Sequence, residues 1–395
     1  MPSFPSHIKT KLPKTGTSIF AIMSAMASEY KAINLSQGFP DFLCDEKLIS
    51  LVEQFMRKGM NQYAPMPGIL NLREAIAEKT EDLYGSKFNP DTEITITPGG
   101  TEAIYAAITA VIQEGDEVIM FEPAYDCYAP AVELNRGVPI YVELRPPEYK
   151  IEWNDVKKLV SQRTKMIMIN SPHNPTGSVL SANDLRQLQR ITLNTDIIIL
   201  SDEVYEHIIF DGLEHHSILK YPRLAERSFV IFSFGKTYHN TGWKMGYCIA
   251  PAELMREFRK AHQFIVFSSN TPIQHAFAEI MKDPSLYLGL KDFYEEKRNY
   301  FLKLMTGLPF TIRPASGSYF QCMGYEKITS EKDQDFAMQL TKDFGVASIP
   351  VSAFYHHNTD YKILRFCFAK EKETLEKAAE RLQKLEPGKQ AKKRA

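Results

Sequence analysis

Short apolar runs that alternate with amphipathic helices are the feature that most constrains the fold of this chain. Between about residues 70 and 280, each such run is followed by a polar loop, and helical patterns lie between the runs. The runs are Glu93–Thr97, Val118–Phe121, Met166–Ile169, Ile197–Leu200 and Phe229–Phe232. Continuous apolar runs of this length are typical of strands buried on both faces of a mostly parallel sheet. The pattern therefore predicts an α/β fold with helices on both faces of the sheet.

The sequence pattern changes after about residue 285. One long helix is predicted over Tyr287–Met305, followed by strands around Ser318–Cys322 and Ile363–Phe368 and a last helix over Lys372–Leu385. This mixture predicts a second, smaller α+β domain. We expect an N-terminal arm and the first part of the small domain over 1–45, the large domain over 46–284, the small domain over 285–386 and a disordered basic tail over 387–395.

The charge balance of the 395-residue chain argues against a polyanion as its partner. Its 47 Lys and Arg residues nearly cancel its 48 Asp and Glu residues, so no net field draws it to nucleic acid or to an anionic membrane. The basic end, EPGKQAKKRA, is interpreted as a solvated terminus rather than a nucleic-acid tail. Small-molecule substrates are therefore expected.

The five cysteines are scattered and include no C-x-x-C pair; they are Cys44, Cys127, Cys248, Cys322 and Cys367. This spacing argues against a disulfide framework and against a metal site, and it favours a reducing compartment. The first residues lack an apolar signal core, and no apolar run reaches membrane-spanning length. A cytoplasmic location is expected.

Polar segments follow the predicted strands at 99–101, 122–125, 170–177, 201–205 and 233–237. In open α/β sheets, ligands bind beyond the carboxyl ends of the strands. We therefore expect these five segments to converge on one edge of the sheet. Together they supply backbone donors, an aromatic ring, an amide, a carboxylate and a lysine, a set that suits a phosphorylated, aromatic, carbonyl-bearing cofactor.

The segment Gly99, Gly100 and Thr101 opens a predicted helix. Free N–H groups at a helix N-terminus favour an anion such as phosphate, and the Ser233 hydroxyl could contact the same anion. A glycine pair before a helix is also typical of an ordinary turn, so this segment is ambiguous by itself.

Asp202, Tyr205 and Asn174 each allow two readings. Asp202 directly follows four apolar residues; it could keep a pyridine nitrogen protonated, so that the ring acts as an electron sink, or it could be a helix cap or structural ion pair. Tyr205 could reach the phenolic oxygen of such a cofactor or simply pack in the core. Asn174 could donate to the same oxygen or begin a turn with Pro175.

Lys236 follows the apolar run Phe229–Phe232 within the tripeptide Gly-Lys-Thr. Most lysines are solvated surface residues, but few lie so soon after a run this apolar. Partial burial and a neighbouring cation would favour the neutral amine, which is the form that reacts with carbonyl groups.

These motifs together resemble the fold-type I aminotransferases of class I and II. The family's lysine motif is matched by Ser233-Phe-Gly-Lys236-Thr followed by Thr241-Gly-Trp-Lys244-Met-Gly-Tyr. Two further signatures of the family are matched by Asp202-Glu-Val-Tyr205 and Asn174-Pro-Thr-Gly. Leu364-Arg365-Phe-Cys-Phe resembles the strand that carries the substrate-carboxylate arginine. The likeness spans nearly the whole chain and implies a seven-stranded type of mostly parallel sheet in the large domain.

The N-terminal part resembles the kynurenine aminotransferase branch, and most closely its bacterial methionine aminotransferases. The motifs are Ser36-Gln-Gly38-Phe-Pro-Asp-Phe and Asn61-Gln-Tyr63-Ala-Pro. Many relatives carry arginine where this chain has Lys244, so the grip on phosphate is expected to differ, because lysine is a point charge rather than a fork. The kynurenine branch often has lysine here.

The resemblance implies a role for each matching residue toward pyridoxal 5'-phosphate and the substrate. Lys236 would bind the cofactor covalently and carry the proton of the reaction. Asp202 would pair with the pyridine nitrogen, Tyr205 and Asn174 would bind the phenolic oxygen, and Tyr125 would stack on the ring. The phosphate would be held by Gly100, Thr101, Ser233 and Lys244, and by Tyr63 of the neighbouring subunit in a homodimer. The substrate carboxylate would be held by Arg365, Asn174 and the Gly38 backbone.

The implied reaction is a ping-pong transfer of an amino group from an amino acid to a 2-oxo acid. Two alternatives stay open: a pyridoxal-phosphate β-lyase that cleaves cysteine S-conjugates, and a non-enzymatic protein that senses the cofactor. Pyruvate and ammonia release without any 2-oxo acid would mark the lyase, and the filled catalytic positions argue against the sensor.

The segments expected to line the substrate pocket are mainly apolar and aromatic. They include Phe20, Tyr63, Tyr125 and the stretch 264–270, which contains Phe267. None offers a second arginine for an acidic side chain, and methionine sulfur packs well against aromatic edges. Methionine, aromatic amino acids and kynurenine are therefore the expected donors, although some of these rings could belong to the core.

Overall fold

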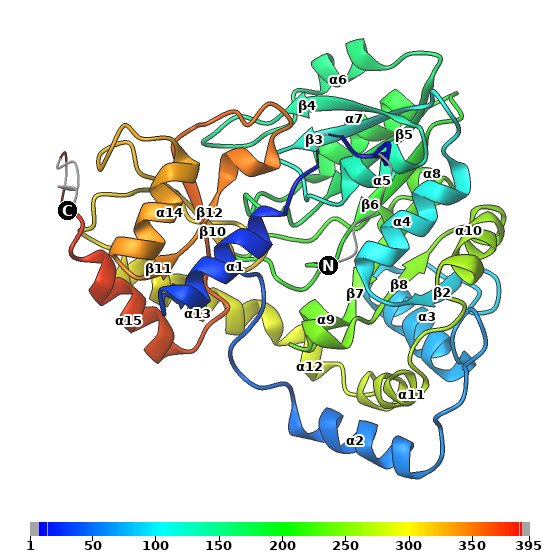
Figure 1. Ribbon diagram of the computed structural model, residues 1–395. Coiled ribbons are helices and arrows are strands. Elements are labelled where there is room, and N and C mark those ends of the chain that lie inside the picture. Colours follow the sequence, from blue (N-terminus) through cyan, green and yellow to red (C-terminus); the bar gives the residue numbers. More distant parts are fainter. Residues whose placement is uncertain (1–7, 14, 387, 389–395) are drawn as a thin grey trace.

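The computed structural model describes residues 8–13, 15–386 and 388 of the chain (Figure 1). Apart from position 388, the predicted tail over 387–395 lies outside the described residues. Within the described ranges, no helix combines the length and the apolar character needed to cross a membrane.

A seven-stranded sheet with the order β2-β8-β7-β6-β5-β3-β4 forms the larger part of the molecule. Only β8 runs antiparallel to its neighbours; the other pairs are parallel. The predicted α/β class with a mostly parallel sheet is thereby confirmed. The strands are β2 Ile94–Thr97, β3 Glu117–Glu122, β4 Val138–Glu143, β5 Thr164–Asn170, β6 Ile198–Asp202, β7 Ser228–Ser233 and β8 Gly246–Ile249.

Both faces of this sheet are buried, because its strands are apolar at every position rather than at alternate ones. Val118, Met120 and Met168 belong to one core, and Ile119 and Phe121 belong to the other. The first core also contains residues of α4 Gly100–Val111, α5 Tyr128–Leu134 and α10 Ala252–Ile265. The second contains residues of α2 Glu46–Arg57, α3 Leu70–Tyr84, α6 Trp153–Leu159, α7 Ala182–Thr192, α8 Pro222–Ala225 and α11 Thr271–Ile280.

A smaller α+β region lies beside the large sheet, on the left of Figure 1. Its antiparallel sheet has the order β12-β13-β10-β9, and a parallel pair joins β1 to β11. A third core fills this region and includes Met23 and Leu35 from the N-terminal segment. The elements are α1 Ile19–Glu29, β1 Ile33–Asn34, α13 Leu290–Leu304, β9 Thr311–Ile312, β10 Phe320–Gly324, α14 Asp333–Asp343, β11 Val346–Ala347, β12 Ile349–Pro350, β13 Ile363–Cys367 and α15 Lys372–Leu382.

The five strands predicted from the apolar runs are all present, but β4 and β8 were not predicted. β4 is an edge strand whose residues are partly exposed and which contains Pro139, so it lacks the continuous apolar pattern. β8 has only four residues. The prediction of a single helix over Tyr287–Met305 is wrong. The segment forms two helices, α12 Ser285–Leu288 and α13, which are separated at Gly289. Glycine is unfavourable in the interior of a helix.

Gly68 allows the start of α3 to approach strand β2. Its φ is +97°, and a Cβ atom at this position would lie 2.2 Å from Ile96 Cγ1. The Pro67 carbonyl accepts a hydrogen bond from the Ile96 N–H at 2.9 Å, so this contact joins the connection before α3 to the edge of the large sheet.

We expect Gly68→Ala to destabilise the fold more than Gly59→Ala. Gly59 also has a positive φ, +84°, but no atom lies within 4 Å of its added Cβ. Both changes cost roughly 1–2 kcal/mol for the left-handed backbone, and overpacking against Ile96 adds roughly 1–3 kcal/mol at position 68 alone. Urea unfolding monitored by circular dichroism measures the difference. Equal losses in the two variants would contradict the steric account.

Candidate active site

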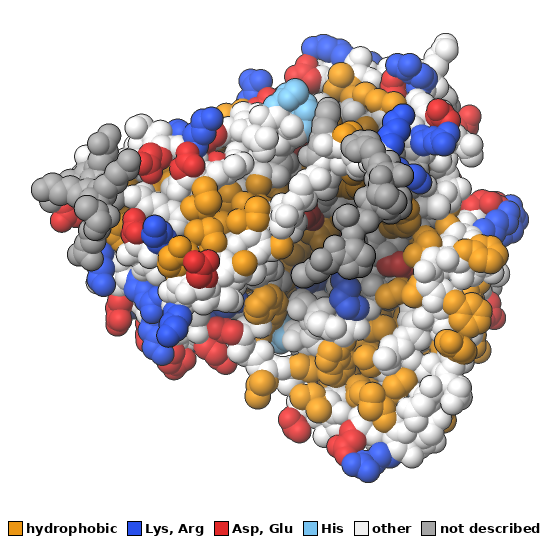
Figure 2. All heavy atoms as spheres, viewed as in Figure 1, with side chains coloured by type: hydrophobic (Ala, Val, Ile, Leu, Met, Phe, Trp, Pro, Cys, Tyr) orange, Lys and Arg blue, Asp and Glu red, His pale blue; other side chains and the backbone are white. Residues whose placement is uncertain are grey.

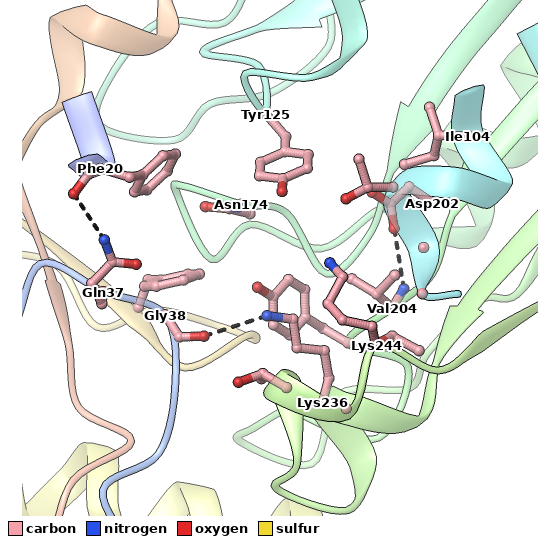
Figure 3. A pocket seen from close by; sticks show the side chains of 18 of the residues that line it. Phe20, Gln37, Gly38, Ile104, Tyr125, Asn174, Asp202, Val204, Lys236 and Lys244 are labelled. Carbon is pink, nitrogen blue, oxygen red and sulfur yellow. Dashed lines mark hydrogen bonds between the residues drawn. The ribbon is translucent and has the colours of Figure 1, made fainter. Parts of the chain in front are cut away.

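A cavity of about 340 Å³ lies at the carboxyl ends of β5, β6 and β7, and a volume of this size suits a small ligand (Figure 3). It draws residues from segments far apart in the chain, including Phe20 at the N-terminal side and Arg365 near the C-terminus. The sequence-predicted site residues that line it are Phe20, Gly38, Gly100, Thr101, Tyr125, Asn174, Asp202, Tyr205, Ser233, Lys236, Lys244 and Arg365.

The N-terminus of α4 lines one corner of this cavity. The first N–H groups of a helix have no intrahelical acceptor and carry the positive end of its dipole. Gly246 lies behind this corner, where a Cβ would lie 2.6 Å from the Phe232 carbonyl oxygen and 3.0 Å from the Gly99 carbonyl carbon. A glycine is therefore needed for α4 to start this close to the strands.

Lys244 adds a positive charge to the same corner. Its backbone is left-handed, with a φ of 55°, and its side chain passes close to Gly99. No ion pair of Lys244 is present within the described part of the chain. A helix N-terminus and an unpaired ammonium group together match the charge of a phosphate.

Asp202, at the end of β6, contributes a buried carboxylate that is 4% exposed. Its Oδ2 accepts a hydrogen bond from the Tyr128 hydroxyl. Its Oδ1 accepts one from the Val204 N–H at 3.3 Å (Figure 3). Burial raises its pKa to about 6, although the hydrogen bond from Tyr128 acts in the opposite direction. The carboxylate is therefore ionised at neutral pH, as the partner of a cationic ring nitrogen must be.

Lys236 lies in the short helix α9 Phe234–Thr237, directly after β7. Its Nζ donates to the Tyr319 hydroxyl at 2.9 Å. It also donates to the Gly38 carbonyl oxygen at 3.3 Å (Figure 3). Burial lowers the pKa of this amine to about 8, and the nearby charges of Lys244 and Arg365 act in the same direction. A substantial neutral fraction therefore exists near neutral pH, and the neutral amine is the form that attacks carbonyl groups.

Arg365 is fully buried, with an exposed fraction of 0%. Its Nη1 donates to Asn174 Oδ1 and its Nη2 to the Ser36 carbonyl, both at 2.8 Å. Its guanidinium lies 3.9 Å from the centre of the Phe320 ring. Within the described residues its Nε has no hydrogen-bond partner. Because leaving a buried charge unsatisfied is costly, this group fits a carboxylate ligand.

Tyr63 and Phe267 are the predicted site residues that do not line the cavity. They lie on the surface of the chain, 83% and 53% exposed, with ring centres 5.2 Å apart in an edge-to-face contact. Figure 2 shows hydrophobic side chains gathered on the lower right of the face in view. Exposed hydrophobic residues of the two segments that carry Tyr63 and Phe267 are Met56, Met60, Phe264 and Ile265.

Some residues of the site could not be found from the sequence. Phe320 lines the cavity from the apolar strand β10, and nothing in its sequence pattern distinguishes it from a core residue. Val204 lies within the predicted segment 201–205, but no role is predicted for it. Asn170 donates through Nδ2 to the Asp202 carbonyl and accepts the Asn174 N–H through Oδ1, both at 2.8 Å, so it positions two predicted residues at once. Tyr128 lies six residues after Glu122, on α5, with no motif around it.

The residues present fit a phosphorylated aromatic aldehyde of the kind expected from the sequence. The N-terminus of α4 and Lys244 would attract a phosphate, Asp202 supplies a carboxylate, and Tyr125 lies across the cavity from Lys236 and Val204 in Figure 3. Of the residues that the structure describes, three with cationic side chains, Lys236, Lys244 and Arg365, and one carboxylate, Asp202, line the cavity. This excess of positive charge suits a ligand set that brings both a phosphate and a carboxylate.

Comparison with known proteins identifies similar sequences and folds. Residues 30–382 match the family described as aminotransferase class I and II. The chain is 46% identical to the methionine aminotransferase of Escherichia coli, over 95% of this chain and 98% of that protein. It is 33% identical to kynurenine–oxoglutarate transaminase 1 of Rattus norvegicus, over 91% of this chain and 93% of that protein.

Solved structures with a similar fold are also aminotransferases. The crystal structure that identified the methionine aminotransferase function in Escherichia coli has a TM-score of 0.94 to this chain, covering 96% of this chain and all of that one at 46% identity. N-succinyldiaminopimelate aminotransferase of Mycobacterium tuberculosis has a TM-score of 0.91 at 34% identity, covering 95% and 99% of the two chains.

We expect Lys236 in the protein freed of ligands to react with an acylating reagent far below the pH at which ordinary lysines react. Its amine loses its proton around pH 8, because burial disfavours the ammonium form. Acylation at limiting reagent between pH 6 and 11, with peptide mass spectrometry of each lysine, measures the midpoint. A midpoint near the ordinary lysine value of about 10.4 would contradict this description of the site.

Proposed function

The chain belongs to the aminotransferase class I and II family, and we propose that it prefers methionine, aromatic amino acids and kynurenine as amino donors. It is a pyridoxal-phosphate-dependent aminotransferase that uses amino acids and 2-oxo acids as substrates. The 46% identity to a methionine aminotransferase, over nearly the full length of both chains, supports the first of these donors. The identity to a kynurenine transaminase supports the third.

The observation that carries the choice of donor is the charge of the cavity around Arg365. Its guanidinium is surrounded by the rings of Phe20, Phe320 and Phe354. No second arginine lines the cavity in the described part of the chain. One cation is enough for an α-carboxylate, whereas a carboxylate side chain buried among these rings would cost several kcal/mol. Thioethers and aromatic rings face no such cost.

The cofactor would be held by the two ends of the cavity. The N-terminus of α4, Thr101, Ser233 and Lys244 would bind the phosphate, with Gly100 as the first residue of the helix. Asp202 would pair with the ring nitrogen, and Asn174 and Tyr205 would donate to the phenolic oxygen, with Tyr125 against one face of the ring. When bound, pyridoxal phosphate accepts the amino group and stores the electron pair released from the substrate's α-carbon.

The side chains of this chain supply the positioning and the proton transfers. Arg365 and Asn174, together with the Gly38 backbone, would fix the substrate carboxylate and so orient the α-carbon toward Lys236. The amine of Lys236, which is partly neutral near neutral pH, would take the proton from the α-carbon as a general base. The aromatic lining would exclude water around these groups and strengthen their electrostatic interactions.

A homodimer is part of the same proposal. Tyr63 and Phe267 contact each other outside the cavity of one chain, on a surface that exposes further large hydrophobic side chains. The Thr271 hydroxyl donates to the Gln62 carbonyl at 2.6 Å and the Ser268 hydroxyl donates to the Ala64 carbonyl at 3.0 Å, so the segments near 62–64 and 267–271 form one surface. Exposed apolar patches of this kind mark interaction sites. We infer that Tyr63 reaches the site of a partner subunit.

A reducing, cytoplasmic location is also inferred. All five cysteines are free thiols. Oxidising compartments favour disulfides, and cytoplasmic enzymes rarely contain them.

We expect kcat/KM for methionine to exceed that for aspartate by at least about tenfold, which corresponds to roughly 1.4 kcal/mol. Steady-state kinetics with methionine, phenylalanine, kynurenine, glutamine and aspartate, with one common oxo acid, measure this ratio. Incubation with a cysteine S-conjugate and no oxo acid serves as the control for lyase activity. A kcat/KM for aspartate equal to or above that for methionine would show that the description of the pocket is wrong.

We expect a mixture of two inactive variants, Lys236→Ala and Tyr63→Phe, to recover activity. If each site takes Tyr63 from its neighbour, a hybrid dimer contains one site with both changes and one intact site. Random subunit exchange makes about half of the dimers hybrid, so activity should rise to about a quarter of the wild-type value. No recovery, despite exchange demonstrated by mass spectrometry, would rule out a shared site.

A further inference from the structure

The hydroxyl group of Tyr319 contacts the reactive lysine, and no motif of the sequence assigns it a role. Its Oη donates a hydrogen bond to the Gly38 carbonyl oxygen and accepts one from Lys236 Nζ at 2.9 Å. Lys236 Nζ also donates to the Gly38 carbonyl at 3.3 Å (Figure 3). A tyrosine hydroxyl has one proton, and Tyr319 donates it to Gly38. The hydroxyl oxygen therefore acts as an acceptor toward the amine of Lys236.

Tyr319 is held rigidly in this position. Its side chain is fully buried, with an exposed fraction of 0%. Its ring packs edge-to-face on Tyr205 at 5.1 Å and on Phe320 at 4.9 Å, and it lies 5.8 Å from the ring of Tyr294. The phenol therefore cannot follow the flexible lysine side chain, and the amine must come to the phenol.

We propose that Tyr319 is a positioning residue, which holds the amine of Lys236 beside the Gly38 carbonyl when no cofactor is attached to that lysine. The proposal goes beyond the proposed function and depends on it only in taking Lys236 as the reactive lysine. Arg365 donates to the Ser36 carbonyl at 2.8 Å. The carbonyl oxygens of the tripeptide 36–38 thus hold both the lysine and the cation that faces the substrate carboxylate.

Two acceptors on one amine have a consequence for its charge. Hydrogen bonds accepted from an ammonium group favour the charged form, whereas burial favours the neutral form. Burial dominates at Lys236, and its pKa falls to about 8. Removing the Tyr319 hydroxyl should therefore lower that pKa further and leave Gly38 as the remaining acceptor.

Tyr319→Phe tests this proposal, with Tyr294→Phe as the matched control. Tyr294 is equally buried, with an exposed fraction of 0%, and within the described residues its hydroxyl has no hydrogen-bond partner. Both variants lose one hydroxyl from the same cluster of rings, but only the first loses a contact with Lys236. The protein freed of cofactor is acylated with limiting acetic anhydride between pH 6 and 10, and Lys236 and Lys244 are followed by peptide mass spectrometry.

We expect the acylation midpoint of Lys236 to fall by roughly 0.5–1 pH unit in Tyr319→Phe and to stay at the wild-type value in Tyr294→Phe. The Lys244 profile should not change in either variant. An unchanged Lys236 midpoint in Tyr319→Phe, or equal shifts in both variants, would overturn the proposal. Thermal unfolding of both variants is the folding control: a Tyr319→Phe protein that fails to fold where Tyr294→Phe folds would show a purely structural hydroxyl and would also overturn it. The labelling experiment uses neither substrate nor cofactor. Its result therefore stays valid even if the enzyme proves unable to transfer an amino group from methionine.

Discussion

The burial of both faces of the seven-stranded sheet is the constraint on which the rest of the structure depends. Helices cover each face, so polar groups can reach solvent or a ligand only at the ends of the strands. The parallel strands β5, β6 and β7 end at the same edge, where they place Asn170, Asp202 and Ser233. The position of the cavity therefore follows from the direction of the strands, before any particular side chain is considered.

Within that cavity, burial shifts the pKa values of the ionisable side chains more than direct charge pairing does. The pKa of Asp202 rises to about 6 and that of Lys236 falls to about 8 for the same reason, which is removal from water. The two values approach each other, yet near neutral pH the carboxylate is mostly charged and the amine is partly neutral. One environment thus yields a charged carboxylate and a partly neutral amine, which are the forms that the proposed roles of Asp202 and Lys236 require.

The sequence predicted the site best where polar residues directly follow the apolar runs that form the strands. The apolar runs predicted five strands, and the residues after them predicted most of the cavity lining, because parallel strands bring such loops together. Edge strand β4 was missed because partial exposure interrupts its apolar pattern. Tyr128, Asn170 and Tyr319 were missed for a different reason. Each makes a hydrogen bond to a residue distant in the sequence, and neither periodicity nor a local motif records such a contact.

The imbalance of charge in the cavity has a consequence for the lifetime of the protein. Among the described residues, three cationic side chains and one carboxylate line the cavity, and the Nε of Arg365 has no hydrogen-bond partner. A folded state with such a site is held below its attainable stability until an anionic ligand enters. A ligand that binds only the folded chain adds about 2.7 kcal/mol at a concentration of about 100 times its Kd. We therefore expect the bound cofactor to stabilise the folded chain, so that its scarcity would shorten the lifetime of the protein as well as lower its activity.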